Sequence, residues 1–161
     1  APIKALVEGL RGIHTFAAPS SAAKSGDYNN SVKRRALTSE HPLVTVHPET
    51  GERMLYISPS FLKSIVGLSP RESQRILEML WEHLVRPEFT VRFKWETGDI
   101  AMWDNRGTAH LAPSDIFESD FDRQLYRITL VGETPHGVDG MASKSLEGAP
   151  ILSLEEELAS L

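Results

Sequence analysis

An alternating stretch between residues 122 and 132 constrains the fold of this chain more than any other feature. It reads Asp-Arg-Gln-Leu-Tyr-Arg-Ile-Thr-Leu-Val-Gly. Successive side chains of a β-strand point to opposite faces, so this stretch predicts a strand with two unlike faces. The mostly apolar face holds Gln124, Tyr126, Ile128 and Leu130, and the face with two guanidinium groups holds Arg123, Leu125, Arg127 and Thr129.

Two arginines side by side are costly to bury unless anions meet them. The face with Arg123 and Arg127 therefore predicts a cavity for carboxylate, sulfate or phosphate, whose oxygens suit paired N–H donors. His110 precedes this strand and is the candidate for chemistry, because a metal ligand and a co-substrate clamp can lie on neighbouring strands of one barrel. The residues alone also allow a core or surface histidine and two solvated arginines on an edge strand.

Composition narrows the class of protein. The 161 residues are 40% hydrophobic and 24% charged, as in one globular domain. The net charge of -5 argues against binding nucleic acid or an anionic membrane, since both need a basic surface. The absence of cysteine excludes disulfides, zinc-thiolate sites and thiol nucleophiles, and fits a cytoplasmic protein. We find no long apolar run and no leader pattern, so we expect neither a transmembrane helix nor a signal peptide.

The first forty residues predict a helix followed by a loop. Apolar residues recur at helical spacing over roughly the first fourteen positions. Residues 17–40 are rich in Ser, Ala, Asn, Gly and Lys and include three consecutive basic residues. Such a segment buries too little surface to offset its ordering entropy, so we expect a mobile loop. A lid that closes over the active site is the functional alternative.

The middle of the chain predicts a hairpin and a helix. Residues 43–46 and 54–57 are short apolar strands joined by a turn rich in Pro and Gly. The triplet His47-Pro48-Glu49 has the spacing of an iron facial triad, but its place in this turn favours a structural role. Ser69-Pro70-Arg71-Glu72 is typical of a helix start with a capping box, and Pro87 ends that helix.

The segment before His110 predicts a second hairpin. Residues 90–95 and 99–104 alternate around Glu96-Thr97-Gly98. We expect Asp104, Asn105 and Arg106 to fix the turn before His110 by local hydrogen bonds rather than to contact substrate. After a loop that begins near residue 133, apolar spacing over residues 151–161 predicts a short terminal helix that packs on the domain or on a second copy.

From His41 to Gly132 the chain resembles the taurine dioxygenase family of iron(II)- and 2-oxoglutarate-dependent oxygenases. The continuation over residues 132–140 is more similar to the alkylsulfatase branch, whose members are sulfate ester dioxygenases. The matching pieces are His-Pro-Leu-Val at 41–44, His-Pro-Glu-Thr-Gly at 47–51, Phe-Leu-Lys-Ser-Ile-Val at 61–66, Trp-Asp-Asn-Arg at 103–106 with His110, and the pair Arg123 and Arg127.

The resemblance implies a mixed α/β, mainly β fold. We expect a double-stranded β-helix, the cupin-like jelly roll, with flanking helices and incomplete in this chain. Residues 1–161 would be the C-terminal portion of a single dioxygenase domain, with 17–40 as loop or lid and 133–161 as tail. The start at Ala1, without an initiator methionine, fits that expectation. Another copy is expected to cover exposed strand edges, which implies a homo-oligomer.

The resemblance also implies roles for four residues. Iron(II) in such enzymes is held by two histidines and one carboxylate, and His110 matches the distal histidine. Arg123 matches the arginine that binds the far carboxylate of 2-oxoglutarate. Arg127 matches the arginine that contacts the near end of the co-substrate and the sulfate or sulfonate of the substrate. Phe61 aligns with an aromatic wall of the substrate pocket, and plain core packing is its alternative.

The implied reaction uses O2 and 2-oxoglutarate and yields succinate and CO2. The carbon next to a sulfate ester or sulfonate is hydroxylated, and the product collapses to an aldehyde and sulfate or sulfite. Taurine and aryloxyalkanoates are rival substrates, and a catalytically inactive fragment that acts as a binding or oligomerisation module is the alternative from another class. No His-x-Asp precedes His110, so one iron ligand is assigned and this chain alone is expected to be inactive.

Overall fold

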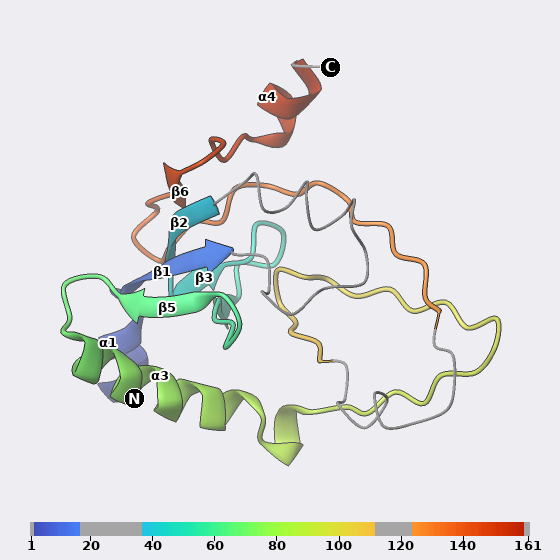
Figure 1. Ribbon diagram of the computed structural model, residues 1–161, viewed down its shortest axis with the longest axis horizontal. Coiled ribbons are helices and arrows are strands. Elements are labelled where there is room, and N and C mark those ends of the chain that lie inside the picture. The colour runs from blue at the N-terminus through green and yellow to red at the C-terminus, as the bar shows by residue number, and fades with distance from the viewer. Residues whose placement is uncertain (1, 17–36, 112–123, 160–161) are drawn as a thin grey trace, which may run out of the picture.

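The computed structural model describes residues 2–16, 37–111 and 124–159 (Figure 1). Two antiparallel sheets and an amphipathic helix form its packed part. Within the described residues no helix is long and apolar enough to cross a membrane. In chain order the elements are α1 (Pro2–Glu8), β1 (Arg11–Phe16), β2 (Leu37–Pro42), β3 (Val44–Val46), β4 (Arg53–Leu55), β5 (Leu62–Ile65), α3 (Pro70–Leu84), the 3-10 helix η1 (Pro87–Phe89), β6 (Lys144–Glu147) and α4 (Leu154–Ala159).

The larger sheet joins distant parts of the chain. Its strand order is β5-β1-β2-β6, and every neighbouring pair is antiparallel. The β1–β2 pairing runs from Arg11 opposite Pro42 to Phe16 opposite Leu37. Because β6 lies beside β2, the C-terminal part of the chain returns to the N-terminal sheet (Figure 1).

The smaller sheet is the predicted hairpin. Strands β3 and β4 pair with Val44 opposite Leu55 and Val46 opposite Arg53. The backbone closes the turn, where His47 N–H donates to the Glu52 carbonyl at 2.8 Å. The turn predicted from Pro and Gly content is therefore confirmed.

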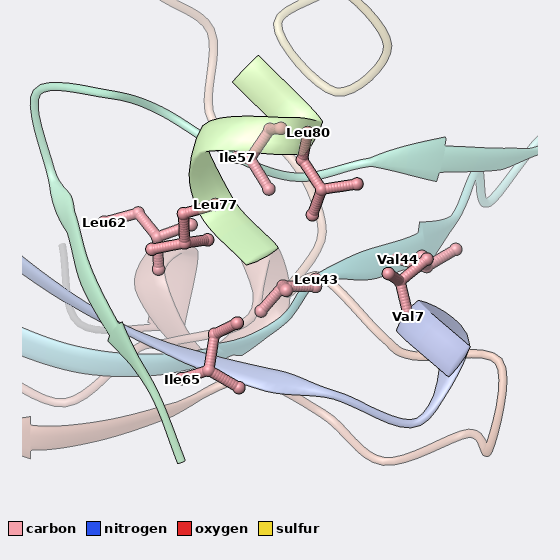
Figure 2. Close-up of a cluster of buried hydrophobic side chains, with 8 residues drawn as sticks. All are labelled: Val7, Leu43, Val44, Ile57, Leu62, Ile65, Leu77 and Leu80. Carbon is pink, nitrogen blue, oxygen red and sulfur yellow. The ribbon is translucent and has the colours of Figure 1, made fainter. Parts of the chain in front are cut away.

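One cluster of buried side chains holds the sheets to α3 (Figure 2). Leu77 and Leu80 point from α3 toward side chains of the sheet layer, and Leu43 is completely buried between them and Val7. Full burial of one such side chain contributes about 1.5–3 kcal/mol. The buried hydrophobic residues are Val7, Leu43, Val44, Ile57, Leu62, Ile65, Leu77 and Leu80.

Helix α3 begins as its sequence predicts. The Ser69 hydroxyl accepts a hydrogen bond from Glu72 N–H, and the Glu72 carboxylate accepts one from Ser69 N–H at 2.8 Å. Pro70 occupies the first turn, and the helix ends at Leu84, before Pro87. The capping box and the stop are both confirmed.

The N-terminal prediction needs two corrections. The helix covers only Pro2–Glu8, and the next residues form β1 instead of completing fourteen helical positions. A side chain at Gly12 would collide with Leu62 and Leu43, so β1 packs closely on the core at this point. The expected loop over 17–40 is also wrong for its last four residues, which belong to β2. The remainder, with the three basic residues and the possible lid, lies outside the described residues.

A buried charge explains why β2 escapes detection in the sequence. Glu40 is 8% exposed, and its carboxylate pairs with Arg11 Nε at 2.6 Å and Lys144 Nζ at 3.1 Å. Burial raises the pKa of Glu40, but the hydrogen bonds from Arg11 and Lys144 outweigh it and leave the pKa lowered. A glutamate satisfied by strands on either side breaks the apolar alternation that would mark a strand.

Three predicted strands are absent from the described residues. Residues 90–95, 99–104 and 124–131 have no regular secondary structure and follow the yellow and orange traces of Figure 1. Their apolar side chains are exposed, by 90% at both Val91 and Ile128. A strand needs hydrogen-bonding partners along its edge, and the described part of the chain places none beside them. The antiparallel sheets and the mixed α/β character are confirmed.

The predicted terminal helix is present but shorter. Helix α4 covers Leu154–Ala159, and Figure 1 shows it beyond β6 at the end of the molecule. Ser153 caps it, since its hydroxyl accepts a hydrogen bond from Glu156 N–H at 3.2 Å, and Ser153 N–H donates in return to the Glu156 carboxylate at 2.8 Å. Leu154 and Leu158 are 40% and 60% exposed. The segment expected as a tail, residues 133–161, also contains β6 and so contributes to the larger sheet.

Candidate metal and anion site

His110 lies in an irregular segment after the turn at residues 104–108. Its side chain is exposed, and its ring centroid is 4.9 Å from that of Trp103 with the planes tilted by 52°. Trp103 Nε1 donates to Asn105 Oδ1 at 3.0 Å. The imidazole is therefore held beside an indole that is itself fixed to the turn.

Asp104 organises that turn. Its carbonyl accepts hydrogen bonds from Thr108 N–H at 3.0 Å and Gly107 N–H at 3.3 Å, and its carboxylate accepts one from Arg106 N–H at 2.8 Å. The Thr108 hydroxyl also donates to the Asp104 carbonyl. The prediction that this motif fixes the turn by local hydrogen bonds is confirmed.

Arg106 completes the turn with a two-point ion pair. Its Nη2 lies 2.7 Å from Asp104 Oδ2, and its Nε lies 2.9 Å from Asp104 Oδ1. These hydrogen bonds, with a further one from His47, hold the pKa of Asp104 well below its usual range. The same pair with Asp104, and a second one with Glu49, raises the pKa of Arg106. Both groups are therefore charged at neutral pH.

His47 links the hairpin to this turn. It is only 9% exposed, and its Nε2 lies 3.0 Å from Asp104 Oδ2. Its Nδ1 accepts the backbone N–H groups of Glu49 and Thr50, each at 3.2 Å. A nitrogen that accepts cannot carry the proton, so Nε2–H donates to Asp104. Both ring nitrogens are engaged, which agrees with a structural role for this triplet rather than metal binding.

Among the residues that the structure describes, the predicted site residues do not contact one another. Arg127 lies exposed in an irregular segment, and within the described residues it makes no hydrogen bond or ion pair with His110. Arg123 lies outside the described residues. Where the chain is described, no three histidine, aspartate or glutamate side chains come together as a metal site. His110 thus offers one imidazole, and these residues alone do not fit an iron centre with three protein ligands.

Phe61 lies in an aromatic pair rather than in the core. It is 42% exposed, and its ring centroid is 5.7 Å from that of Phe16 at the end of β1. Thr15 N–H donates to the Phe61 carbonyl at 2.9 Å, which ties the pair to the sheet edge. Plain core packing is therefore wrong for Phe61.

A cluster of rings on the larger sheet was not predicted from the sequence. The centroid of His41 lies 4.8 Å from that of His14 and 5.2 Å from that of Tyr56. His41 Nδ1 is 2.7 Å from Ser143 Oγ, whose hydroxyl donates to the Pro135 carbonyl at 3.0 Å. Since the serine has one hydrogen, His41 Nδ1–H is the donor to Ser143. The sequence pattern carries no signal for this cluster, because its members come from separate segments of the chain.

The cluster has unusual protonation. Burial, the charge of a protonated His14 and that of Arg11 lower the pKa of His41 to about 4. Burial also lowers the pKa of His14 and raises that of Tyr56. All three groups are thus neutral at neutral pH, as expected for polar rings packed against one another.

Comparison with known proteins identifies the family. Residues 1–129 match the family described as “Taurine catabolism dioxygenase TauD, TfdA family”. An alkylsulfatase of Acinetobacter baylyi is 45% identical over 107 residues, which cover 66% of this chain and 33% of that protein. An alpha-ketoglutarate-dependent sulfate ester dioxygenase of Pseudomonas putida is 47% identical over 107 residues, covering 66% of this chain and 35% of that protein.

A solved structure agrees with this family match. The crystal structure of a taurine dioxygenase from Burkholderia xenovorans is 62% identical, with a TM-score of 0.80, and the match covers 93% of this chain and 48% of that one. The chain thus spans about a third of the curated relatives and about half of the solved one. With 129 of its 161 residues matched, the chain belongs to the TauD/TfdA family of iron(II)- and 2-oxoglutarate-dependent dioxygenases.

Proposed function

We propose that the protein containing this chain is a dioxygenase that acts on a sulfate ester or a sulfonate. One oxygen atom of O2 is inserted into a C–H bond of the carbon next to the sulfur-bearing group. The other is incorporated into succinate as 2-oxoglutarate loses CO2. The hydroxylated carbon then releases sulfate or sulfite and becomes an aldehyde. The observation that carries the proposal is the match to an alkylsulfatase and a sulfate ester dioxygenase at 45% and 47% identity.

In this proposal the chain is the C-terminal portion of a single dioxygenase domain with a jelly-roll core. Two observations support it. The chain covers about half of a solved relative that it resembles at a TM-score of 0.80. The alternating segments 90–104 and 124–131 are irregular and largely exposed, as expected when an alternating segment has no neighbouring strand to pair with. A cytoplasmic location and a homo-oligomer stay predictions.

Four side chains have roles in the proposal. His110 supplies one imidazole for iron(II), which provides the oxidising chemistry when it is bound, and the other ligands come from elsewhere in the protein. Arg123 and Arg127 hold the carboxylates of 2-oxoglutarate and the sulfate or sulfonate group, because a guanidinium fork matches such oxygens. Phe61, half exposed beside Phe16, forms an apolar wall for the carbon chain of the substrate.

The test is substrate turnover by the whole protein with iron(II) and 2-oxoglutarate. A medium-chain alkyl sulfate and taurine are supplied separately, and succinate, sulfate and sulfite are measured. Sulfate and succinate in equal amounts from the alkyl sulfate support a sulfate ester dioxygenase, whereas sulfite from taurine supports the sulfonate alternative. Residues 1–161 alone should release neither, since one assigned ligand holds iron poorly. Turnover by those residues alone would refute the assignment of His110 as one ligand of several.

A non-catalytic binding module is the second candidate. It is favoured by the lack, within the described ranges, of a three-residue metal group. Calorimetric titration of the whole protein with iron(II) and with 2-oxoglutarate under anaerobic conditions separates the two. Binding of both in one-to-one ratio supports the dioxygenase, and binding of neither supports the module.

A further inference from the structure

We propose that His47 and Arg106 are positioning residues that fix the segments carrying His110 and Arg127 to the β3–β4 hairpin. The inference rests on the proposed function for the roles of His110 and Arg127. It goes beyond that function because neither His47 nor Arg106 is expected to touch iron, co-substrate or substrate.

The hairpin presents a preorganised donor. His47 begins the turn after β3, and two backbone N–H groups of that turn hold its Nδ1. The His47 side chain is 11% exposed, so its orientation is set by packing as well as by hydrogen bonds. Its Nε2–H then meets Asp104, which is 57 residues away in the sequence. Because His47 is held in place, it also holds Asp104, the residue on which the turn at 104–108 is built.

The turn at 104–108 transmits that position toward His110. Asp104 accepts hydrogen bonds from Arg106 at its carboxylate and from Gly107 and Thr108 at its carbonyl, which tie the turn to this one residue. The turn also lies against β4, since a side chain at Gly107 would come within 3.1 Å of Met54 Sδ. His110 follows two residues after Thr108 and rests against Trp103, which precedes Asp104.

Arg106 extends the network to the second segment. Its Nη2 lies 2.9 Å from Glu49 Oε1, and its Nη1 lies 3.1 Å from Glu133 Oε2. Glu133 follows the segment that carries Arg127, and just beyond it Val46 N–H donates to the His136 carbonyl at 3.0 Å. The end of that segment is therefore held to the same hairpin by a side chain and by the backbone.

The arrangement differs from a scatter of surface ion pairs. Isolated exposed pairs contribute little, because two long side chains must be ordered for a screened attraction. Here one guanidinium serves three carboxylates, and Arg106 is 31% exposed at its side chain. The partners come from residues 49, 104 and 133, which lie in three separate segments. The geometry of these ion pairs therefore suits holding the three segments in place relative to one another more than raising the global stability.

The experiment measures local opening and metal binding in the whole protein. The variants are His47→Leu, which removes the donor to Asp104, His47→Gln, whose amide can restore it, and Arg106→Gln. Arg75→Gln is the matched control, because Arg75 makes an exposed ion pair within α3 with Glu78. Amide hydrogen exchange is followed at Gly107 and Thr108 in the turn and at Val66 beside β5. Manganese(II) affinity with 2-oxoglutarate present is measured by calorimetry.

The proposal expects a localised effect. In His47→Leu and Arg106→Gln, hydrogen exchange at Gly107 and Thr108 becomes faster, while exchange at Val66 stays at its wild-type rate. Manganese affinity falls by about tenfold or more, which is the usual effect of losing a residue that supports a ligand. His47→Gln restores most of the slow exchange and most of the manganese affinity that His47→Leu loses, and Arg75→Gln changes neither quantity.

Two results overturn it. Unchanged exchange at Gly107 and Thr108 would show that the turn is held without the network. Equal acceleration at Val66 would show a role in global stability only. If the wild-type protein binds no manganese, the proposed function fails, and hydrogen exchange still decides whether His47 and Arg106 position the segments.

Discussion

Acid sensitivity of the larger sheet follows from the protonation of His41. The substitution His41→Asn places a side chain that does not titrate on β2, and its amide can still donate to Ser143 Oγ as Nδ1–H does in the wild type. This substitution removes the ionisable group and keeps the hydrogen bond to the C-terminal segment. Any change in the pH dependence of unfolding then reports on the protonation of His41.

The sign and size of the effect come from the pKa of His41. In the unfolded chain it is near 6.5, and in the folded protein burial, His14 and Arg11 lower it to about 4. The unfolded state therefore takes up a proton first as the pH falls. The stabilisation by neutral His41 is complete above pH 6.5, declines below it and is lost near pH 4. At pH 5 this loss is about 2 kcal/mol, or about 1 kcal/mol after solvent screening of a partly exposed ring.

Urea unfolding of the whole protein at pH 7 and pH 5 measures this difference. The wild type should lose about 1 kcal/mol more unfolding free energy between the two pH values than His41→Asn. His14, whose pKa is also lowered by burial, remains in both proteins, so the difference reports on His41 together with its charge coupling to His14. His83→Asn, on the exposed side of α3, is the control and should keep the wild-type loss. Equal losses in wild type and His41→Asn, or an NMR pKa of His41 near 6.5, would refute the reasoning.

Two other substitutions test the anion clamp and the core. Arg123→Lys should raise the 2-oxoglutarate requirement of the whole protein about tenfold, roughly 1.4 kcal/mol, because lysine cannot form a two-point pair with a carboxylate; Arg75→Lys is its control, and an unchanged requirement would count against the assignment. Ser73→Ala should lower the free energy of unfolding by about 1–3 kcal/mol in urea titrations, because Ile65 N–H, now 3.0 Å from Ser73 Oγ, loses a buried acceptor. Ser60→Ala, at an exposed position, should change little, and an equally stable Ser73→Ala would contradict the role of that bond.

The features that the sequence predicts correctly are local ones. The hairpin turn at residues 47–52, the capping box of Ser69 with Glu72, and the turn around Asp104 all depend on hydrogen bonds between residues a few positions apart. Residue types at fixed offsets determine such bonds, so the sequence carries them directly. The apolar spacing of α3 is local in the same sense.

The features that the sequence does not predict depend on distant partners. β2 contains a glutamate that is stable in the sheet because Arg11 and Lys144 meet it from other strands. His47 has its partner 57 residues away at Asp104. Conversely, the alternation over residues 90–104 suits a strand but supplies no neighbour for it. Pattern alone indicates which face a residue would take, whereas the other members of the sheet decide whether the strand forms.

In the described part of the chain, the eight buried hydrophobic side chains all lie between Val7 and Leu80, whereas His110 and Arg127 are exposed and lie in irregular segments. A melting temperature measures the packed half, because most of the apolar surface removed from water is there. Thermal-shift screens of variant libraries will therefore report sensitively on changes near α3. Substitutions at His110 or Arg127 will leave the melting temperature nearly unchanged in such screens. Binding or turnover assays are therefore needed to rank variants of the proposed site.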